Sequence, residues 1–178
     1  MFLMTWAWLI SVGMAAPRPL TVGPGQPALA FALTAVNEEV ATETVNKVQV
    51  SLADFAGMMP PHARKALVVH FFERSGGPED LKALNRIQRR YANRGVQVVA
   101  ISGDPDSKAA LADRIATLRL DYPVLRDNHR VVIGRYGITE LPITLVIEGN
   151  GNVFAIGQPR GADVEEAISA ELVPLLSR

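Results

Sequence analysis

The sequence contains no cysteine. Disulfide bonds, thiolate nucleophiles, cysteine-ligated zinc and iron–sulfur clusters are therefore excluded from the chemistry of the chain. Methionine, which occurs five times, is the only sulfur-containing residue. Cysteine usage consequently gives no information about the redox compartment in which the protein works.

Charge of one sign is not in excess either. The 18 Lys and Arg residues balance the 18 Asp and Glu residues, so the formal net charge is zero. Proteins that track phosphate groups or lie on anionic membranes usually carry surplus positive charge, so we expect no nucleic-acid partner. The three histidines are scattered at positions 62, 70 and 129. Without cysteine they form no metal-ligand spacing, and we expect no metal or other cofactor.

The long apolar run of the sequence is at its N-terminus. Residues Phe2 to Ala16 carry no charged side chain, and the run is too short to cross a bilayer core of about 30 Å. Gly13 and Ala15 are the small residues that a signal peptidase prefers if it cuts before Ala16. We therefore predict a signal peptide over residues 1–15, an extended lead-in over 16–27 and one domain over 28–178.

This division predicts an exported protein, periplasmic or extracellular, with no stable membrane span after processing. The positively charged n-region of a signal peptide is missing, however. A mis-assigned start codon or a short N-terminal anchor is therefore the alternative.

The centre of the sequence predicts a βαβ unit. The run "ALVVHFF" (66–72) is continuous in β-branched and aromatic residues, as in a strand covered on both faces. A helix is predicted from Pro78, and the glycine of "NRG" (93–95) is its expected C-cap. The segment 96–102 is the second strand, parallel to the first. The helix has apolar residues at helical spacing, namely Leu81, Leu84, Ile87 and Tyr91.

The flanking segments complete one α/β domain. After the βαβ unit we predict a helix over 107–118, a short strand in "YPVL", a short helix before Gly137, and a hairpin of strands 143–147 and 153–156 around an Asn-Gly turn. A capping box of Asp163 and Glu166 would begin the last helix. Before the unit we expect short strands over 28–36 and 47–50 and a helical turn over 51–55. The predicted fold is a central mixed sheet, βαβ then ββα, flanked by helices and extended by an N-terminal strand.

This order resembles the thioredoxin fold, and the residues resemble its redoxin branch, which holds TlpA-like and alkyl hydroperoxide reductase/thiol-specific antioxidant-like proteins. The similarity covers nearly everything after Leu20. It is carried by segments that follow one another as in that branch: "TVGPGQPALAFALT", "VSLADFAG", "RRYANRGVQVVAISGDPDS", "YPVLRD" and "RYGITELPITLVIEGNGNV".

The resemblance places a degenerate active site after the first central strand. TlpA-type members carry Trp-Cys-x-x-Cys there, and aligning "VHFFERSGGPEDL" puts Ser75 at the Trp, Gly76 at the first Cys and Glu79 at the second. The Gly77-Pro78 turn is retained, and so is Pro142, where the fold places a cis proline facing the turn. Thiol–disulfide exchange needs a thiolate, and peroxiredoxin chemistry passes through a cysteine sulfenic acid. The inherited reaction is therefore chemically excluded.

Three hypotheses for function follow from the resemblance. The first is a binding or scaffold module without thiol activity, in which an extended peptide or protein segment pairs with a groove between residues 75–79 and Leu141, Pro142 and Ile143. The second is an enzyme of another kind that uses Glu79 or His70 in the same cleft. The third is a protein that keeps only the family's label of oxidoreductase or antioxidant. We favour the first hypothesis, so we expect that the protein is not an enzyme.

His70 stands where thioredoxins carry a buried Asp that relays protons. A histidine could titrate near neutral pH, but with no thiol to serve we expect a hydrogen-bonded core residue. The carboxylates Glu73, Glu79 and Asp80 are read as stabilising the helix dipole rather than as a catalytic cluster.

Two surface features carry alternative interpretations. A row of arginines on the helix after Pro78 is either a solvated face or a docking face for an acidic partner: Arg86, Arg89, Arg90 and Arg94. The apolar loop "MMPP" (58–61) either covers the degenerate site or offers a contact elsewhere.

Overall fold

The computed structural model describes residues 20–74 and 77–178. The predicted signal peptide and residues 16–19 of the lead-in lie outside the described residues, as do Ser75 and Gly76. The helices and strands are β1 (Ala32–Thr34), α1 (Glu38–Val45), β2 (Gln49–Ser51), β3 (Ala66–Phe72), α2 (Gly77–Tyr91), β4 (Val96–Ser102), α3 (Lys108–Ala116), β5 (Val124–Arg126), α4 (Val131–Arg135), β6 (Ile143–Glu148), β7 (Val153–Gly157) and α5 (Asp163–Leu176). Single 3-10 turns follow β2 and α2.

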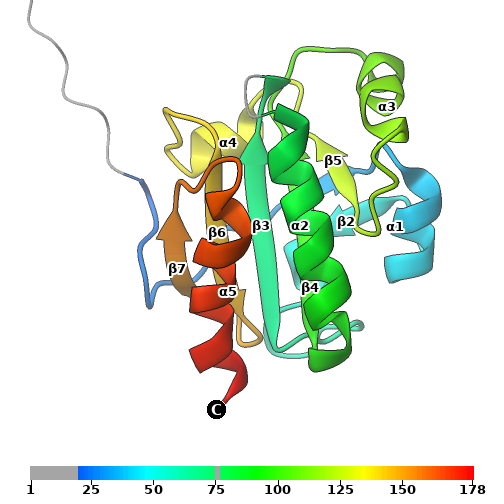
Figure 1. Cartoon of the computed structure of the whole chain (residues 1–178). Helices are drawn as coiled ribbons and strands as arrows, with labels where there is room; N and C mark the ends of the chain where they lie inside the picture. Colours follow the sequence, from blue (N-terminus) through cyan, green and yellow to red (C-terminus); the bar gives the residue numbers. More distant parts are fainter. Residues whose placement is uncertain (1–19, 75–76) are drawn as a thin grey trace, which may run out of the picture.

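A five-stranded mixed sheet with the order β5-β4-β3-β6-β7 forms the centre of the molecule (Figure 1). The strand β3 runs parallel to β4 and antiparallel to β6, and β7 returns beside β6 as the second strand of the hairpin. All seven residues of β3 and all seven of β4 are buried. The predictions of a mixed α/β fold and of a doubly covered βαβ strand pair are confirmed.

Helices cover both faces of this sheet because successive strand residues point to opposite sides. Phe71 packs in a cluster that includes residues of α1, α4 and the two-stranded β1–β2 sheet. Phe72, one residue later, packs in a second cluster with residues of α2, α3 and α5. Figure 1 shows α2 between α5 and α3 on that second face. Within residues 20–74 and 77–178, no helix is both long and apolar enough to cross a bilayer.

Several predicted boundaries were accurate because local chemistry set them. Ser107 caps α3 by accepting a hydrogen bond from the backbone N–H of Ala110 at 3.2 Å. Gly95 takes a left-handed conformation with φ of 86° after the turn that follows α2, as a glycine C-cap should.

Two predictions were wrong. The polar stretch between the first two predicted strands forms α1, and β1 is restricted to Ala32–Thr34. Ala41 and Val45, four residues apart, are the buried residues of this helix, and so small an apolar face is easily overlooked. The capping box is also wrong, because Asp163 is already the first helical residue and Ala162 in the cap position makes no side-chain hydrogen bond.

Gly149, directly after β6, is a position at which the fold leaves no room for a side chain. Its N–H donates to the carbonyl of Lys65 at 3.0 Å, and an added Cβ would lie 2.5 Å from the carbonyl oxygen of Arg64. We expect Gly149→Ala to lower the free energy of unfolding by about 1–3 kcal/mol through this clash.

The matched control is Gly134→Ala in α4, where an added Cβ meets nothing within 4 Å. That change should leave stability unchanged or raise it by up to about 1 kcal/mol, since alanine favours helix. Urea unfolding of both variants makes the comparison. A Gly149→Ala protein as stable as the wild type would contradict the close approach of the two backbone segments.

Candidate functional site

The degenerate turn follows the C-terminal end of β3. Because β4 is parallel to β3 and β6 is antiparallel, the end of β4 and the start of β6 lie at the same edge: Phe72 is paired with Ser102, and Phe71 with Ile143. The peptide bond between Leu141 and Pro142, just before β6, is cis. The helix α2 begins at this edge with Gly77, whose φ is 63°. Ser75 and Gly76, the other members of the predicted turn, lie outside the described residues.

A network of ion pairs holds the residue that precedes the turn. The backbone N–H of Arg74 donates to Asp104 Oδ1 at 2.8 Å, and its Nη2 donates to both carboxylate oxygens of Asp106 at 3.1 and 3.0 Å. Arg114 of α3 donates to the same two aspartates. The loop after β3, the loop after β4 and α3 are thereby joined at one point.

Asp104 is the buried member of this network, with 5% of its surface exposed. Burial by itself would raise its pKa, but hydrogen bonds from Arg114, from the Arg74 N–H and from Ser102 outweigh that effect and keep the pKa of Asp104 below its usual value. The carboxylate is therefore ionised and structural at neutral pH.

The loop before α5 contacts α2, one residue beyond the predicted wall 75–79, and also contacts the other wall at Leu141. Gly161 donates its backbone N–H to Oδ1 of Asp80, which is 3% exposed. Arg160 donates from Nη2 to the carbonyl oxygen of Leu141 at 3.1 Å. Burial raises the pKa of Asp80, although the Gly161 N–H and Arg160 oppose the increase.

The described groove residues follow the end of β3 on one side and precede or begin β6 on the other, but they are not equally accessible. Leu141, Pro142 and Ile143 are all buried, and the carbonyl of Leu141 already accepts from Arg160. On the other wall, Pro78 and Glu79 are exposed. A partner at this edge would therefore meet backbone groups and charged side chains rather than an open apolar channel.

His70 is fully buried in the middle of β3. Its Nδ1 lies 2.9 Å from the hydroxyl oxygen of Thr144, its ring stacks 6.1 Å from that of Phe72, and its Nε2 has no hydrogen-bond partner in the described part of the chain. Burial lowers the pKa of His70 to about 4, so the imidazole is neutral at physiological pH. This geometry is that of a hydrogen-bonded core histidine.

The second hypothesis needed His70 or Glu79 in a shared cleft. A cavity of about 370 Å³ does lie beside the turn, between α2 and α3, but neither residue lines it. Glu79 instead pairs with Lys82 at 3.0 Å on the exposed side of α2. Within the described ranges, no cluster of three His, Asp or Glu side chains is arranged to hold a metal ion.

The charged network was not predicted from the sequence. Arg74 and Arg114 were not singled out, and Asp104 and Asp106 were noted only within a segment that resembles the redoxin branch. A signal was present, because two aspartates closely follow a mostly apolar strand and an arginine stands two helical turns after Asp106. The sequence could not show that Arg74, from the neighbouring loop, would join them.

Comparison with known proteins agrees with this geometry. The model of the AhpC/TSA family matches residues 24–156. The chain belongs to the AhpC/TSA family. Among curated relatives of this AhpC/TSA protein is the thiol-disulfide oxidoreductase ResA of Bacillus anthracis, 26% identical over 94 residues. ResA of Bacillus cereus is 24% identical over 126 residues, which are 70% of this chain and 67% of the relative.

The alignment to the Bacillus anthracis relative covers 53% of each chain, so this AhpC/TSA protein spans about half the length of that relative. A solved structure of a putative thiol:disulfide interchange protein DsbE from Chlorobium tepidum is similar in fold, with a TM-score of 0.70 and 22% identity over 88% of this chain and 99% of that one. Peroxidoxin BcpB from Mycobacterium tuberculosis has a TM-score of 0.65 and 16% identity over 88% and 97%. The predicted redoxin branch of the thioredoxin-like superfamily is confirmed.

Three arginines of the predicted row lie on α2 and bind carboxylates elsewhere in the chain, and the fourth lies in the 3-10 turn that follows α2. Arg86 and Arg90 contact Glu165 of α5 at 2.5 and 3.4 Å. Arg89 contacts Asp121 at 2.5 Å, and Arg94 lies over the ring of Tyr91. These contacts favour the interpretation as a solvated, internally paired face over a docking face.

The loop "MMPP" lies at the other end of the sheet. Gly57 donates its N–H to the carbonyl of Gly149, which follows the end of β6, whereas Pro142 precedes its start. Met58 and Met59 are 100% and 93% exposed. The suggestion that this loop covers the degenerate site is therefore wrong.

The buried imidazole predicts a pH dependence of stability for this AhpC/TSA protein. The folded-state pKa of about 4 lies below the ordinary value of 6.5, so the unfolded chain binds the proton first as the pH falls. The stabilisation is present above pH 6.5 and is lost between 6.5 and 4. It amounts to roughly 3 kcal/mol, since one pKa unit corresponds to about 1.4 kcal/mol.

Urea unfolding of the wild type and of His70→Asn from pH 7 to pH 4 measures this contribution. The wild type should lose more stability than the variant across the window, whereas His62→Asn, in a loop, should behave like the wild type. Parallel pH profiles for the wild type and His70→Asn would contradict the assignment.

Proposed function

We propose that this chain is an exported thioredoxin-fold protein without thiol redox activity, which binds an extended protein or peptide segment at the edge formed by α2 and the start of β6. The proposal rests on one observation: every cysteine is missing, but hydrogen bonds still hold the surrounding elements together. Asp80 binds Gly161, and Arg160 binds the carbonyl of Leu141. Relatives are named thiol-disulfide oxidoreductases, but that reaction requires a sulfur nucleophile.

Binding would use the backbone of Leu141, because its side chain is buried. A segment added as a strand donates an N–H to the Leu141 carbonyl, and in the proposed geometry it takes the place of the Arg160 guanidinium there. The displaced guanidinium keeps its charge and its N–H donors, which suit a carboxylate. The partner is therefore an extended segment that carries an acidic side chain close to the paired residue.

Export is supported by the N-terminal sequence. Residues 1–15 have the apolar character of a signal peptide and end in the small residues that a signal peptidase prefers. The working protein in this proposal begins near Ala16 and acts outside the cytoplasm.

A randomised array of extended decapeptides, probed with the chain from residue 16 onward, tests the binding proposal. We expect the wild type to select peptides that contain Asp or Glu. Arg160→Glu should reverse that preference toward Lys and Arg, because the displaced side chain then carries the opposite charge.

The control is Arg178→Glu, which removes an exposed ion pair with Glu148 at the other end of the sheet and should leave the selection unchanged. Arg160 is itself exposed, so its substitution should not unfold the protein. If the array selects nothing, or if the preference is the same with Arg160→Glu, the peptide-binding proposal is wrong.

A further inference from the structure

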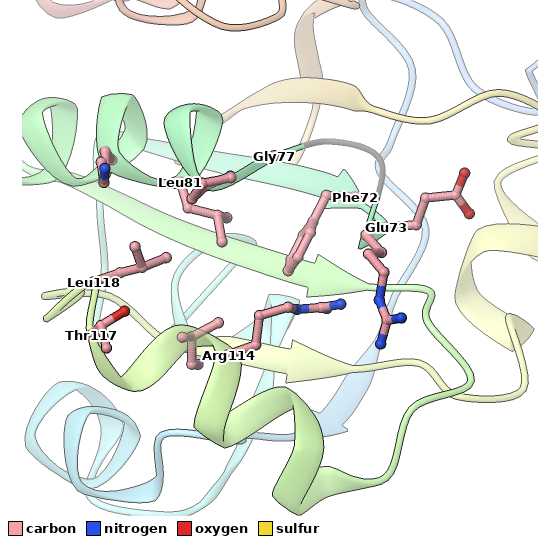
Figure 2. A pocket seen from close by; sticks show the side chains of 11 residues that line it. Phe72, Glu73, Gly77, Leu81, Arg114, Thr117 and Leu118 are labelled. Atoms are coloured by element: carbon pink, nitrogen blue, oxygen red, sulfur yellow. The ribbon is translucent and has the colours of Figure 1, made fainter.

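The cavity of about 370 Å³ beside the turn shares Gly77 and Pro78 with the predicted groove, but residues 141–143 do not line it. It lies between α2 and α3 (Figures 1 and 2), whereas the loop before α5 contacts Asp80 of α2 and the carbonyl of Leu141. Its volume falls within the roughly 300–1,000 Å³ typical of small-molecule sites. Nothing in the proposed peptide contact uses it.

The floor of this cavity is apolar. Phe72 at the end of β3, Leu81 of α2 and Ile115 of α3 line it, and each is 5% exposed or less. Pro78 and Leu118 add further apolar surface to the walls. Figure 2 shows Leu81 and Leu118 pointing into the space from its two sides, with Phe72 beside them. Such a surface holds the apolar body of a ligand.

The charged part of the lining is mainly cationic. Three cations line the cavity, namely Arg74, Lys82 and Arg114, against one carboxylate, Glu73. Glu73 is paired with Arg130, and its carboxylate points away from the two leucines in Figure 2. Asp104 and Asp106, which bind the two arginines, do not line the cavity.

The guanidinium groups retain binding capacity in this position. Each has five N–H donors, and in the described part of the chain the side chain of Arg74 donates to Asp106 only through Nη2. Its side chain is 73% exposed, while that of Arg114 is 29% exposed. A second carboxylate can therefore bind at the cavity without breaking the network that fixes the turn.

The geometry points to a binding site for a small amphipathic carboxylate. The apolar body lies between α2 and α3 against Phe72, Leu81 and Ile115, and the carboxylate lies at Arg74 and Arg114. A neutral apolar molecule would leave the guanidinium donors unused, and a small hydrophilic anion would leave the apolar floor exposed. The ligand class follows from both features, because the guanidinium groups favour a carboxylate and the apolar floor favours a hydrocarbon body.

Calorimetric titration of the chain from residue 16 onward with sodium octanoate tests the site. Octanol serves as the uncharged analogue and butyrate as the short one. We expect octanoate to bind at least roughly tenfold more tightly than either, because only octanoate uses both halves of the site. Arg74→Gln should weaken octanoate binding roughly tenfold, and Leu118→Trp should abolish it by filling the cavity.

Matched substitutions outside the cavity are the controls. Arg89→Gln removes an exposed, ion-paired arginine elsewhere on α2, and Val173→Trp adds bulk to an exposed position on α5; neither should change octanoate binding. Circular dichroism verifies the fold of each variant, and nitrogen-15 NMR shifts should centre on Leu81 and Ile115. Absence of octanoate binding, equal affinity for octanol, or unchanged affinity in a folded Arg74→Gln protein would each overturn the proposal. These outcomes are independent of the peptide array.

Discussion

The complete burial of β3 is the constraint on which the rest of the structure depends. Its seven residues pair with β4 on one side, six of them pair with β6 on the other, and helices cover both faces. No polar side chain along this strand reaches water, and His70 is accommodated by Thr144 and by remaining neutral. Polar and charged groups therefore gather where the strand ends, after Phe72. Both the degenerate turn and the cavity lie there for that reason.

Ion pairs and hydrogen bonds to charged groups, rather than cysteines, hold the segments together at this end of the sheet. Most ion pairs of the protein are solvent-exposed, and such pairs contribute about 0–1 kcal/mol each. Asp104 differs because it is buried and bound at once by Arg114, the Arg74 N–H and Ser102. Removing one partner of a buried pair typically costs about 3–5 kcal/mol. Asp104 thus joins the loops after β3 and β4 to α3, and Asp80 joins α2 to the loop before α5; neither contribution needs a cysteine.

Much of the fold could be predicted from the sequence because its strongest signals are local. The uninterrupted apolar run 66–72, the Asn-Gly turn before β7 and the Ser107 cap each determine their own structure. The short helix α1 was missed because only Ala41 and Val45 are buried on it. The last helix was given a false cap because a Ser/Thr/Asp-x-x-Glu spacing is common and specifies a cap only when the first residue stays outside the helix.

The candidate site was less predictable, because its contacts join segments far apart in the chain. Alignment to the redoxin pattern located the turn and Pro142. It could not show that Arg160 donates a hydrogen bond to the carbonyl of Leu141 or that Arg74 forms an ion pair with Asp106, since those contacts depend on how the loops pack. It also could not show at which end of the sheet the loop of Met58 and Met59 lies, so covering the degenerate site was one of two interpretations of that loop.

The central claim is that the architecture of the family is kept while its reactive atoms are missing. The most direct test is dithiothreitol-driven reduction of insulin, measured for the wild type and for a Gly76→Cys, Glu79→Cys double variant. The account predicts no acceleration by the wild type and clear catalysis by the double variant, in which both aligned sulfur positions are filled. Turnover by the wild type, or an inactive double variant that is correctly folded, would contradict it.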